Sequence, residues 1–405
     1  MKPIVRAGRM KPVHSDIRGP LFVEAMNRQK QGIDILKLNT GNPATFGFGL
    51  PDSIKNALIE HMQDGVGYCD FKGMPQARQA ICDYETSKGI KGITSDDVFI
   101  GNGVSEVVSF ALTPLLNDGD EVLVPSPSYS LWGNSVYLED GKPVFYTCDE
   151  QANWYPDIKD IRSKITDKTK AIVIINPNNP TGVLYPKELL LEIIQIARES
   201  GLLIFADEIY DRLVMDGKQH ISLASLTEDV PVITLNGLSK SHCLCGYRCG
   251  WMVISGPREL TEDYRQGIIQ LTSLRLCANT MAQIVIPAAL DDMDTPASMV
   301  RPGGRIYEQR EATVRELEKI DGLSFVKNDA AFYVFPKLDV KKFNITNDKQ
   351  FAHDLLDATN ILLVPGSGFD WKDPDHFRIV MLPQADILSD AIRRMGTFLD
   401  GYKQK

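Results

Sequence analysis

Residues 97–255 alternate short apolar segments with amphipathic ones, and this alternation constrains the fold more than any other feature. Seven of the segments are apolar over most of their length, which is typical of strands buried on both faces. They are residues 98–100, 121–124, 144–146, 171–175, 202–206, 232–235 and 251–254. Between several of them, apolar residues recur three and four positions apart, which predicts helices. The sequence therefore predicts an α/β domain with a mainly parallel, seven-stranded sheet.

After about residue 300 the pattern changes. A long charged helix over residues 304–319 and a final amphipathic helix over residues 385–398 enclose short predicted strands. This arrangement predicts a smaller α+β domain. We expect three parts: an N-terminal arm with part of the small domain (1–50), a large domain (51–295) and a small C-terminal domain (296–405). A long helix near residues 259–290 is expected to join the domains.

Composition narrows the possible partners and the compartment. The formal net charge is −9 and no cluster of five Lys or Arg occurs, so nucleic acid is not an expected partner. No apolar run approaches the roughly 18 residues of a membrane span, and residues 1–20 lack the apolar stretch of a secretory signal. Seven cysteines, an odd count, favour a reducing cytoplasm. Their spacing fits no common zinc pattern, so no metal site is expected.

Polar residues follow several predicted strands at the point where each strand ends. Asn176 to Gly182 follows one strand, Asp207 to Tyr210 the next, and Asn236 to Lys240 another. Functional loops of such sheets gather at the carboxyl ends of the strands. A single lysine there is usually a surface residue. An ordered set of Asn, Asp, Tyr, Lys and Arg at one sheet edge instead indicates a binding site.

The residue types in this set suit pyridoxal 5′-phosphate (PLP). Forming a carbanion at the α-carbon of an amino acid needs an electron sink, which PLP supplies. The cofactor needs a lysine amine for covalent attachment and a buried carboxylate at its pyridine nitrogen. Its phosphate needs a helix N-terminus and an arginine.

The motifs also resemble a known family. Asn-Pro-Asn-Asn179-Pro-Thr-Gly, Asp207-Glu-Ile-Tyr210, Ser239-Lys240 and Gly-Tyr-Arg248-Cys-Gly occur in the order found in the fold-type I, class I/II aminotransferases. The similarity extends over roughly residues 16–401 and implies the PLP-dependent transferase fold of type I. It implies that Lys240 holds PLP as a Schiff base and then moves the proton of the reaction.

The resemblance implies roles for the other motif residues. Asp207 would pair with the pyridinium nitrogen, while Asn179 and Tyr210 would hydrogen-bond the phenolic oxygen of PLP. The further implied cofactor contacts are Gly103, Val104, Ser105, Tyr129, Ser239 and Arg248. Tyr68 resembles a tyrosine that reaches the phosphate in the partner subunit, which implies a homodimer with shared active sites. Gly237 stands where many relatives have Ser or Thr, so one phosphate donor is missing.

The residues expected to bind the substrate also resemble those of this family. Arg378 matches the arginine that binds the α-carboxylate of an amino acid or 2-oxo acid, and Gly41 matches a glycine whose backbone approaches the substrate. The segments around Arg18, Gly41, Tyr68 and Arg301 resemble bacterial alanine (glutamate–pyruvate) aminotransferases, although Ser15 replaces a frequent tyrosine. The implied reaction is L-alanine + 2-oxoglutarate = pyruvate + L-glutamate. Arg18 is expected to bind the distal carboxylate of glutamate or, alternatively, to pair with a carboxylate of the large domain.

Other classes of protein fit less well. A dehydrogenase needs Gly-x-Gly-x-x-Gly, but Gly101-Asn-Gly103 is followed by Glu106 at the third glycine position. A P-loop needs Gly-Lys-Ser/Thr, which does not occur. A non-catalytic regulator on the same scaffold would carry an added DNA-binding domain, for which there is no expected room before Asp16. A β-lyase or another class I aminotransferase, acting on aspartate, aromatic or branched-chain substrates, remains open.

Overall fold

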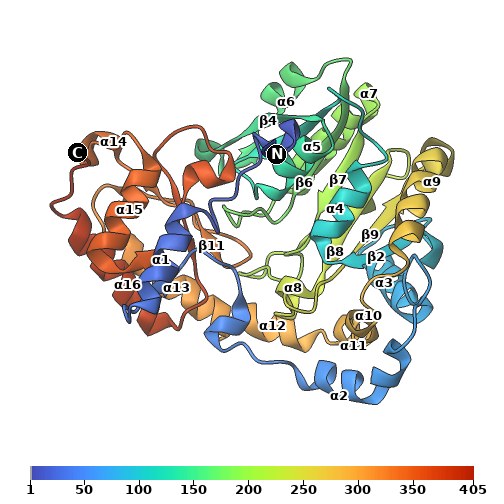
Figure 1. The fold of residues 1–405 in the computed structure, drawn as a ribbon, viewed down its shortest axis with the longest axis horizontal. Helices are drawn as coiled ribbons and strands as arrows, with labels where there is room; N and C mark the ends of the chain where they lie inside the picture. Colours follow the sequence, from blue (N-terminus) through green and yellow to red (C-terminus); the bar gives the residue numbers. More distant parts are fainter. Residues whose placement is uncertain (1) are drawn as a thin grey trace.

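A computed structural model describes residues 2–405, and a twisted central sheet occupies the larger part of the molecule (Figure 1). Its strand order is β2-β9-β8-β7-β6-β3-β4-β5. The strands are β2 (Val98–Asn102), β3 (Glu121–Ser126), β4 (Lys142–Asp149), β5 (Tyr155–Pro156), β6 (Thr169–Ile175), β7 (Leu203–Asp207), β8 (Val232–Gly237) and β9 (Cys249–Ser255). β9 runs antiparallel to both of its neighbours and β5 runs antiparallel to β4, whereas the other pairs are parallel.

The α/β fold and all seven predicted strands are confirmed, but the sheet has an eighth strand. β5 pairs through only two residues with the end of β4. A strand of two residues is too short to show the alternation from which strands are predicted. The sheet is therefore one strand wider than expected, at the edge farthest from β2.

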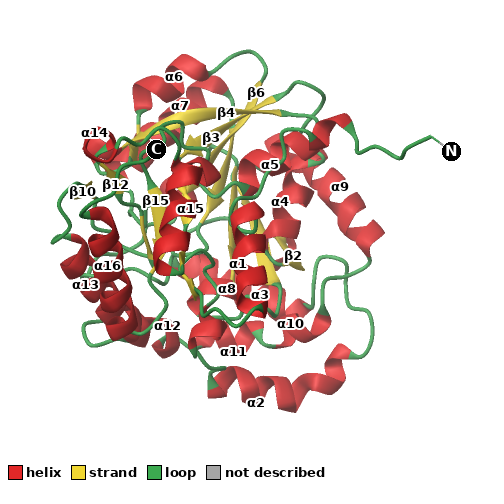
Figure 2. Ribbon diagram, turned by 60° about the vertical axis from the view of Figure 1, so that its left-hand side comes forward, coloured by secondary structure: helices red, strands yellow, loops and turns green. Residues whose placement is uncertain are grey.

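Helices cover both faces of this sheet (Figure 2). Along β7, Phe205 packs with α4 (Val104–Leu112), α5 (Leu131–Leu138) and α9 (Arg258–Arg275), while Ile204 and Ala206 point to the other face. That second face is covered by α6 (Ile158–Lys164) and α7 (Lys187–Ser200), and toward β2 by α3 (Pro75–Ser87), α10 (Thr280–Ile284) and α11 (Ile286–Asp291). Burial on both faces explains why these strands are almost continuously apolar.

A separate core lies in the C-terminal part of the chain, on the left of Figure 1. It is formed by α13 (Arg305–Leu317), α15 (Asp348–Thr359) and α16 (Ala385–Leu399), which surround the antiparallel strands β11 (Tyr333–Val334), β14 (Val364–Pro365) and β15 (Phe377–Val380). The strand β1 (Leu36–Lys37) pairs with β13 (Ile361–Leu362), so residues near the N-terminus join this C-terminal core.

The predicted long helix over residues 259–290 is wrong. Three helices occupy this stretch: α9, α10 (Thr280–Ile284) and α11 (Ile286–Asp291). α9 ends where Leu276 adopts a φ of +78°, and the Asn279 side chain then caps α10. Apolar residues continue through the break, so the sequence pattern hides it. The chain passes to the C-terminal core through α12 (Asp294–Val300) instead (Figure 1).

No single described helix is long and apolar enough to cross a membrane. The pair Arg258–Arg275 and Thr280–Asp291 passes the same length and composition test jointly, but it is bent by 119°.

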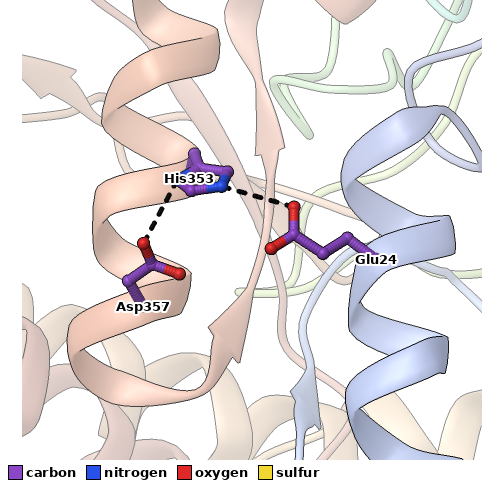
Figure 3. A group of neighbouring side chains, drawn as sticks. All are labelled: Glu24, His353 and Asp357. Carbon is purple, nitrogen blue, oxygen red and sulfur yellow. Dashed lines mark ion pairs between the residues drawn. The ribbon is translucent and has the colours of Figure 1, made fainter.

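Helix α1 (Pro20–Lys30) is fixed to α15 by packing and by ion pairs (Figure 3). His353 of α15 lies 3.3 Å from Glu24 of α1 and 3.3 Å from Asp357. The guanidinium of Arg28 bonds to both of those carboxylates. The acidic groups therefore already share a cation from the chain itself, and the cluster serves to hold α1 in place.

We call residues 8–18, which precede α1, the arm. The arm reaches from α1 to helix α5 of the large sheet region. The backbone N–H of His14 donates to Asn134 Oδ1 over 3.1 Å, and Asn134 Nδ2 donates back to the His14 carbonyl over 2.5 Å. Arg9 forms an ion pair with Asp140 at 3.0 Å. The arm thus connects the two regions of the molecule.

The start of α4 depends on a close approach of Gly250 to the backbone of Gly103 and Val104. A Cβ on Gly250 of β9 would lie 2.4 Å from the backbone nitrogen of Val104. Because backbone atoms cannot move away as a flexible side chain can, we expect Gly250→Ala to lower the free energy of unfolding by about 3 kcal/mol. Urea titration measures this loss. Gly401→Ala is the control, since its Cβ would meet open space. Equal stability of Gly250→Ala and the unsubstituted protein would contradict this packing.

Candidate active site

Side chains from the ends of several strands meet residues of the C-terminal region on one side of the sheet. Asp207 ends β7, Asn179 lies in the loop after β6, and Lys240 lies in the short helix α8 (Leu238–Ser241) directly after β8. Lys240 Nζ donates to the carbonyl of Gly41 over 3.0 Å, and Arg378 of β15 donates to Asn179 over 3.0 Å. The predicted sheet-edge residues are therefore brought together with Gly41 and Arg378.

Asp207 is buried with few partners. Its Oδ2 accepts a hydrogen bond from the indole N–H of Trp132 over 3.0 Å, and its Oδ1 lies 3.4 Å from the N–H of Ile209. Burial raises the pKa of Asp207 to about 6, although the Trp132 hydrogen bond opposes this effect. A buried carboxylate without a cationic partner can bind a protonated nitrogen of a ligand.

Lys240 is more accessible than Asp207. It is only partly buried, and besides the Gly41 carbonyl its ammonium lies 5.9 Å from the centre of the Phe332 ring. Neither partner is a carboxylate. A primary amine held by a single backbone carbonyl is available to react with an electrophilic carbon.

Two tyrosines line the same space. The hydroxyls of Tyr210 and Tyr333 lie 3.0 Å apart, both buried, and burial raises the pKa of Tyr210 well above its ordinary value. A Cβ on Gly41 would come within 2.3 Å of the Tyr333 hydroxyl. Gly41 is therefore a position where only a glycine lets the backbone pass this close to the tyrosine pair.

Arg378 is buried to 1 % exposure, and within residues 2–405 it has no carboxylate partner. Its Nη1 donates to Asn179 Oδ1, its Nη2 to the carbonyl of Asn39, and its Nε has no partner. The rings of Tyr333 and Phe369 lie 4.6 and 4.7 Å from the guanidinium. Burial lowers the pKa of this arginine. A buried cation held only by dipoles and ring faces can bind an anion.

A second group of unpaired donors lies at the start of α4. Gly103 precedes the helix with a φ of +85°, and a Cβ there would come within 2.3 Å of Arg248 Nη2. Within the described part of the chain, the guanidinium of Arg248 forms one hydrogen bond, from Nη1 to the Cys245 carbonyl at 2.9 Å. The free N–H groups of Val104 and the exposed Ser105 at the helix start lie next to this guanidinium. This combination suits a phosphate.

Four of the predicted residues lie outside the cluster formed by Lys240, Asp207 and Arg378, or at its margin. Ser239 is buried beside Lys240, and Tyr129 is about one-third exposed just before α5. Tyr68 is 85 % exposed in a loop, so it does not join the cluster of its own chain. Arg18 is exposed at the end of the arm and forms no ion pair within the described chain, so the alternative pairing with a carboxylate of the large domain is not found.

Sequence reasoning missed three contributors: Trp132, Tyr333 and Asn39. Trp132 follows Tyr129 by three residues, a spacing that places both near the start of α5, and this was an available signal. Tyr333 and Asn39 had no such signal, because their partners Tyr210 and Arg378 lie 123 and 339 positions away in the sequence.

Known proteins resemble this chain over its full length. The family model described as aminotransferase class I and II matches residues 33–392. The chain belongs to the class I and II aminotransferase family. It is 50 % identical over 404 residues to the glutamate-pyruvate aminotransferase AlaA of Haemophilus influenzae, with both chains fully covered. It is 45 % identical to the alanine aminotransferase of Mycobacterium tuberculosis, covering 100 % of this chain and 94 % of that one.

A solved structure supports the same family. The crystal structure of an aminotransferase from Escherichia coli superposes with a TM-score of 0.98 at 47 % identity, and both chains are fully covered. The fold type I predicted for this aminotransferase is therefore confirmed. PLP is the cofactor of the class I and II aminotransferase family.

The burial of Asp207 predicts a pH-dependent loss of stability in the ligand-free aminotransferase. The unfolded carboxyl loses its proton near the ordinary pKa of 3.8, but the folded one near 6. Between these values the unfolded state binds fewer protons, so stability falls as pH rises. About two pH units at about 1.4 kcal/mol each give a loss of about 3 kcal/mol.

Asp207→Asn cannot ionise and removes this loss. The free energy of unfolding of the variant, relative to the unsubstituted protein, should rise by about 3 kcal/mol between pH 4 and pH 7 in urea titrations. A difference that stays constant over this range would show that Asp207 is not destabilised by its burial.

Proposed function

We propose that the protein is a PLP-dependent aminotransferase that transfers an amino group between L-alanine and 2-oxoglutarate, giving pyruvate and L-glutamate by a ping-pong mechanism. The observation that carries this proposal is the convergence of three groups that lack partners of opposite charge: the Lys240 amine, the buried Asp207 carboxylate and the buried Arg378 guanidinium. The names of the full-length relatives support the choice of substrates.

The residues fit PLP group by group. The space beside Gly103, which a Cβ would fill, lies between Arg248 and the start of α4 and suits the phosphate. The Asp207 carboxylate, with only an indole and a weak backbone donor, suits the ring nitrogen. When bound, PLP supplies an electron sink for the electron pair left at the substrate α-carbon.

The side chains of the chain then have distinct tasks. Lys240 anchors the cofactor through its amine and carries the proton between the α-carbon and the cofactor. Asp207 keeps the proton on the ring nitrogen, and Asn179 and Tyr210 donate to the phenolic oxygen. Arg378 binds the α-carboxylate of each substrate in turn. The remaining proposed cofactor contacts are Val104, Ser105, Tyr129 and Ser239, with Gly41 beside the substrate.

The glutamate/2-oxoglutarate pair and the alanine/pyruvate pair differ in charge, but both must bind in the same site. Glutamate and 2-oxoglutarate carry a second carboxylate, whereas alanine and pyruvate do not. A fixed buried cation for that carboxylate would be left unpaired with alanine, at a cost of several kcal/mol. Arg18 avoids this cost, because it is exposed on the arm and forms no ion pair within residues 2–405 that it would have to release. We therefore assign the distal carboxylate to Arg18.

We also propose a homodimer with shared active sites. Tyr68 lies on an exposed loop next to the segment after α9: Arg275 Nη2 donates to the Phe71 carbonyl over 3.1 Å, and Thr280 donates to the Gly65 carbonyl over 2.7 Å. Val66, Tyr68 and Leu274 are each more than three-quarters exposed. We propose that a partner subunit covers these apolar side chains and that Tyr68 reaches the phosphate site of that subunit.

We also propose a division of the chain into three parts. They are an N-terminal part with the arm and part of the small domain (1–50), a large domain (51–295) and a small domain (296–405). Separate apolar cores on the central sheet and in the C-terminal region support it. A cytoplasmic location is proposed on the basis of the seven cysteines, all free.

Covalent attachment at Lys240 is the direct test of the cofactor proposal. The purified protein should absorb in the near-visible, and reduction with borohydride should fix PLP to one peptide, the one that contains Lys240. Lys240→Ala should lose the covalent label and nearly all turnover, because the anchor and the proton carrier are both removed. Lys218→Ala, which alters a lysine paired with Asp329 at 2.6 Å, is the control. Label on a peptide without Lys240 would overturn the assignment.

Arg18→Ala tests the substrate assignment. We expect kcat/KM for glutamate and 2-oxoglutarate to fall by the equivalent of roughly 2–3 kcal/mol, the scale of hydrogen bonds to a charged group. Alanine and pyruvate should be affected much less. Lys11→Ala changes another exposed cation of the arm and should leave both substrate pairs unaffected. Equal losses for the two pairs in Arg18→Ala would exclude a role in specificity.

A further inference from the structure

Asn39 contacts both the buried arginine and the arm. Its backbone carbonyl accepts a hydrogen bond from Arg378 Nη2. Its side-chain Nδ2 donates to the carbonyl of Ile17 over 2.9 Å. Ile17 is the residue immediately before Arg18. One residue therefore joins the site proposed for the α-carboxylate to the segment proposed to bind the distal carboxylate.

The position of Asn39 is rigid. The preceding residue, Leu38, accepts a hydrogen bond from the N–H of Val380 over 3.0 Å and donates to the Leu362 carbonyl over 2.8 Å. Val380 lies on β15, the strand that carries Arg378. Asn39 is thereby held between two strands, and a movement of its backbone would move the carbonyl that contacts Arg378.

The side chain of Asn39 is poorly suited to a purely structural role. It is 1 % exposed, and its Oδ1 has no hydrogen-bond partner. A buried unsatisfied acceptor costs about 1–3 kcal/mol, so an apolar residue of similar shape would stabilise the fold better. Among residues 2–405, the only hydrogen-bond partner of the side chain is the arm.

The arm is also attached next to the proposed cofactor site, through its residue His14. His14 is bound on both its N–H and its carbonyl by Asn134 of α5. Trp132 of the same helix holds Asp207. The arm therefore spans from the helix that contacts Asp207 to the residue that contacts Arg378, and Arg18 lies at the Asn39 end.

We propose that Asn39 is a positioning residue for dicarboxylate substrates: its amide fixes the arm at Ile17, so that Arg18 is held at a defined distance from the α-carboxylate bound on Arg378. This inference rests on the proposed function, since it requires that Arg18 and Arg378 bind the two ends of glutamate and 2-oxoglutarate. Monocarboxylate substrates need only Arg378 and are independent of the arm.

The test uses Asn39→Leu and Asn39→Ala in the full-length, PLP-loaded protein. Hydrogen exchange of the peptide covering residues 12–19, measured without substrate, should speed up at least about fivefold, the equivalent of one hydrogen bond of about 1 kcal/mol. KM for glutamate and 2-oxoglutarate should rise by a similar factor, and by clearly more than KM for alanine and pyruvate. In an Arg18→Ala background the Asn39 substitution should add nothing to KM.

Asn328 provides the matched control. It is fully buried, its Oδ1 is also without a partner, and its single side-chain hydrogen bond goes to Ala330, away from the arm. Asn328→Leu and Asn328→Ala should leave exchange of the arm unchanged. Unchanged arm exchange in both Asn39 variants, or equal KM increases for the two substrate pairs, would overturn the inference. Faster arm exchange in a protein that turns over none of the four substrates would instead overturn the proposed function.

Discussion

The buried charge of Arg378 is the interaction on which the site depends. Burying a cation costs free energy unless it is paired, and this arginine has no carboxylate partner in the described chain. The chain compensates with two carbonyl oxygens, from Asn179 and Asn39, and with the faces of two aromatic rings. These groups come from the large sheet region and from the C-terminal core. The two regions therefore meet around a charge that an anionic ligand would complete.

Asp207 is a buried acidic group without a cationic partner, as Arg378 is a buried cation without an acidic one. Its carboxylate is buried with an indole N–H as the main donor, and its raised pKa reflects the cost of ionising there. A ligand that brings a protonated nitrogen to Asp207 and a carboxylate to Arg378 would relieve both costs. The folding of the chain thus leaves two charges of opposite sign without partners, which is typical of sites whose ligands supply the missing charges.

The sequence predicted the parts of this structure that depend on local pattern. The seven longer strands are visible because each is buried on both faces, and the site residues of the sheet edge are visible because they follow those strands directly. β5 was missed because two residues carry no periodicity. The break after Leu276 was missed because the apolar pattern continues across it.

Contacts between distant parts of the chain could not be predicted in this way. Trp132 meets Asp207 across 75 positions, and Asn39 meets Arg378 across 339. Nothing in the local sequence of Asn39 distinguishes its buried amide from that of an ordinary loop asparagine. Its place beside Arg378 follows from the hydrogen bond between Val380 of β15 and Leu38, and its relation to the arm follows from the hydrogen bond to Ile17.

Arg378, held without a carboxylate partner, is proposed to bind the substrate carboxylate. Titration of the PLP-loaded protein with 2-oxoglutarate, which cannot accept an amino group from that form, measures binding without turnover. We expect 2-oxoglutarate to raise the melting temperature of the unsubstituted protein, and Arg378→Leu to bind it at least about a hundredfold more weakly, as the loss of charged hydrogen bonds implies. Equal binding by the two proteins would show that Arg378 does not bind the substrate carboxylate.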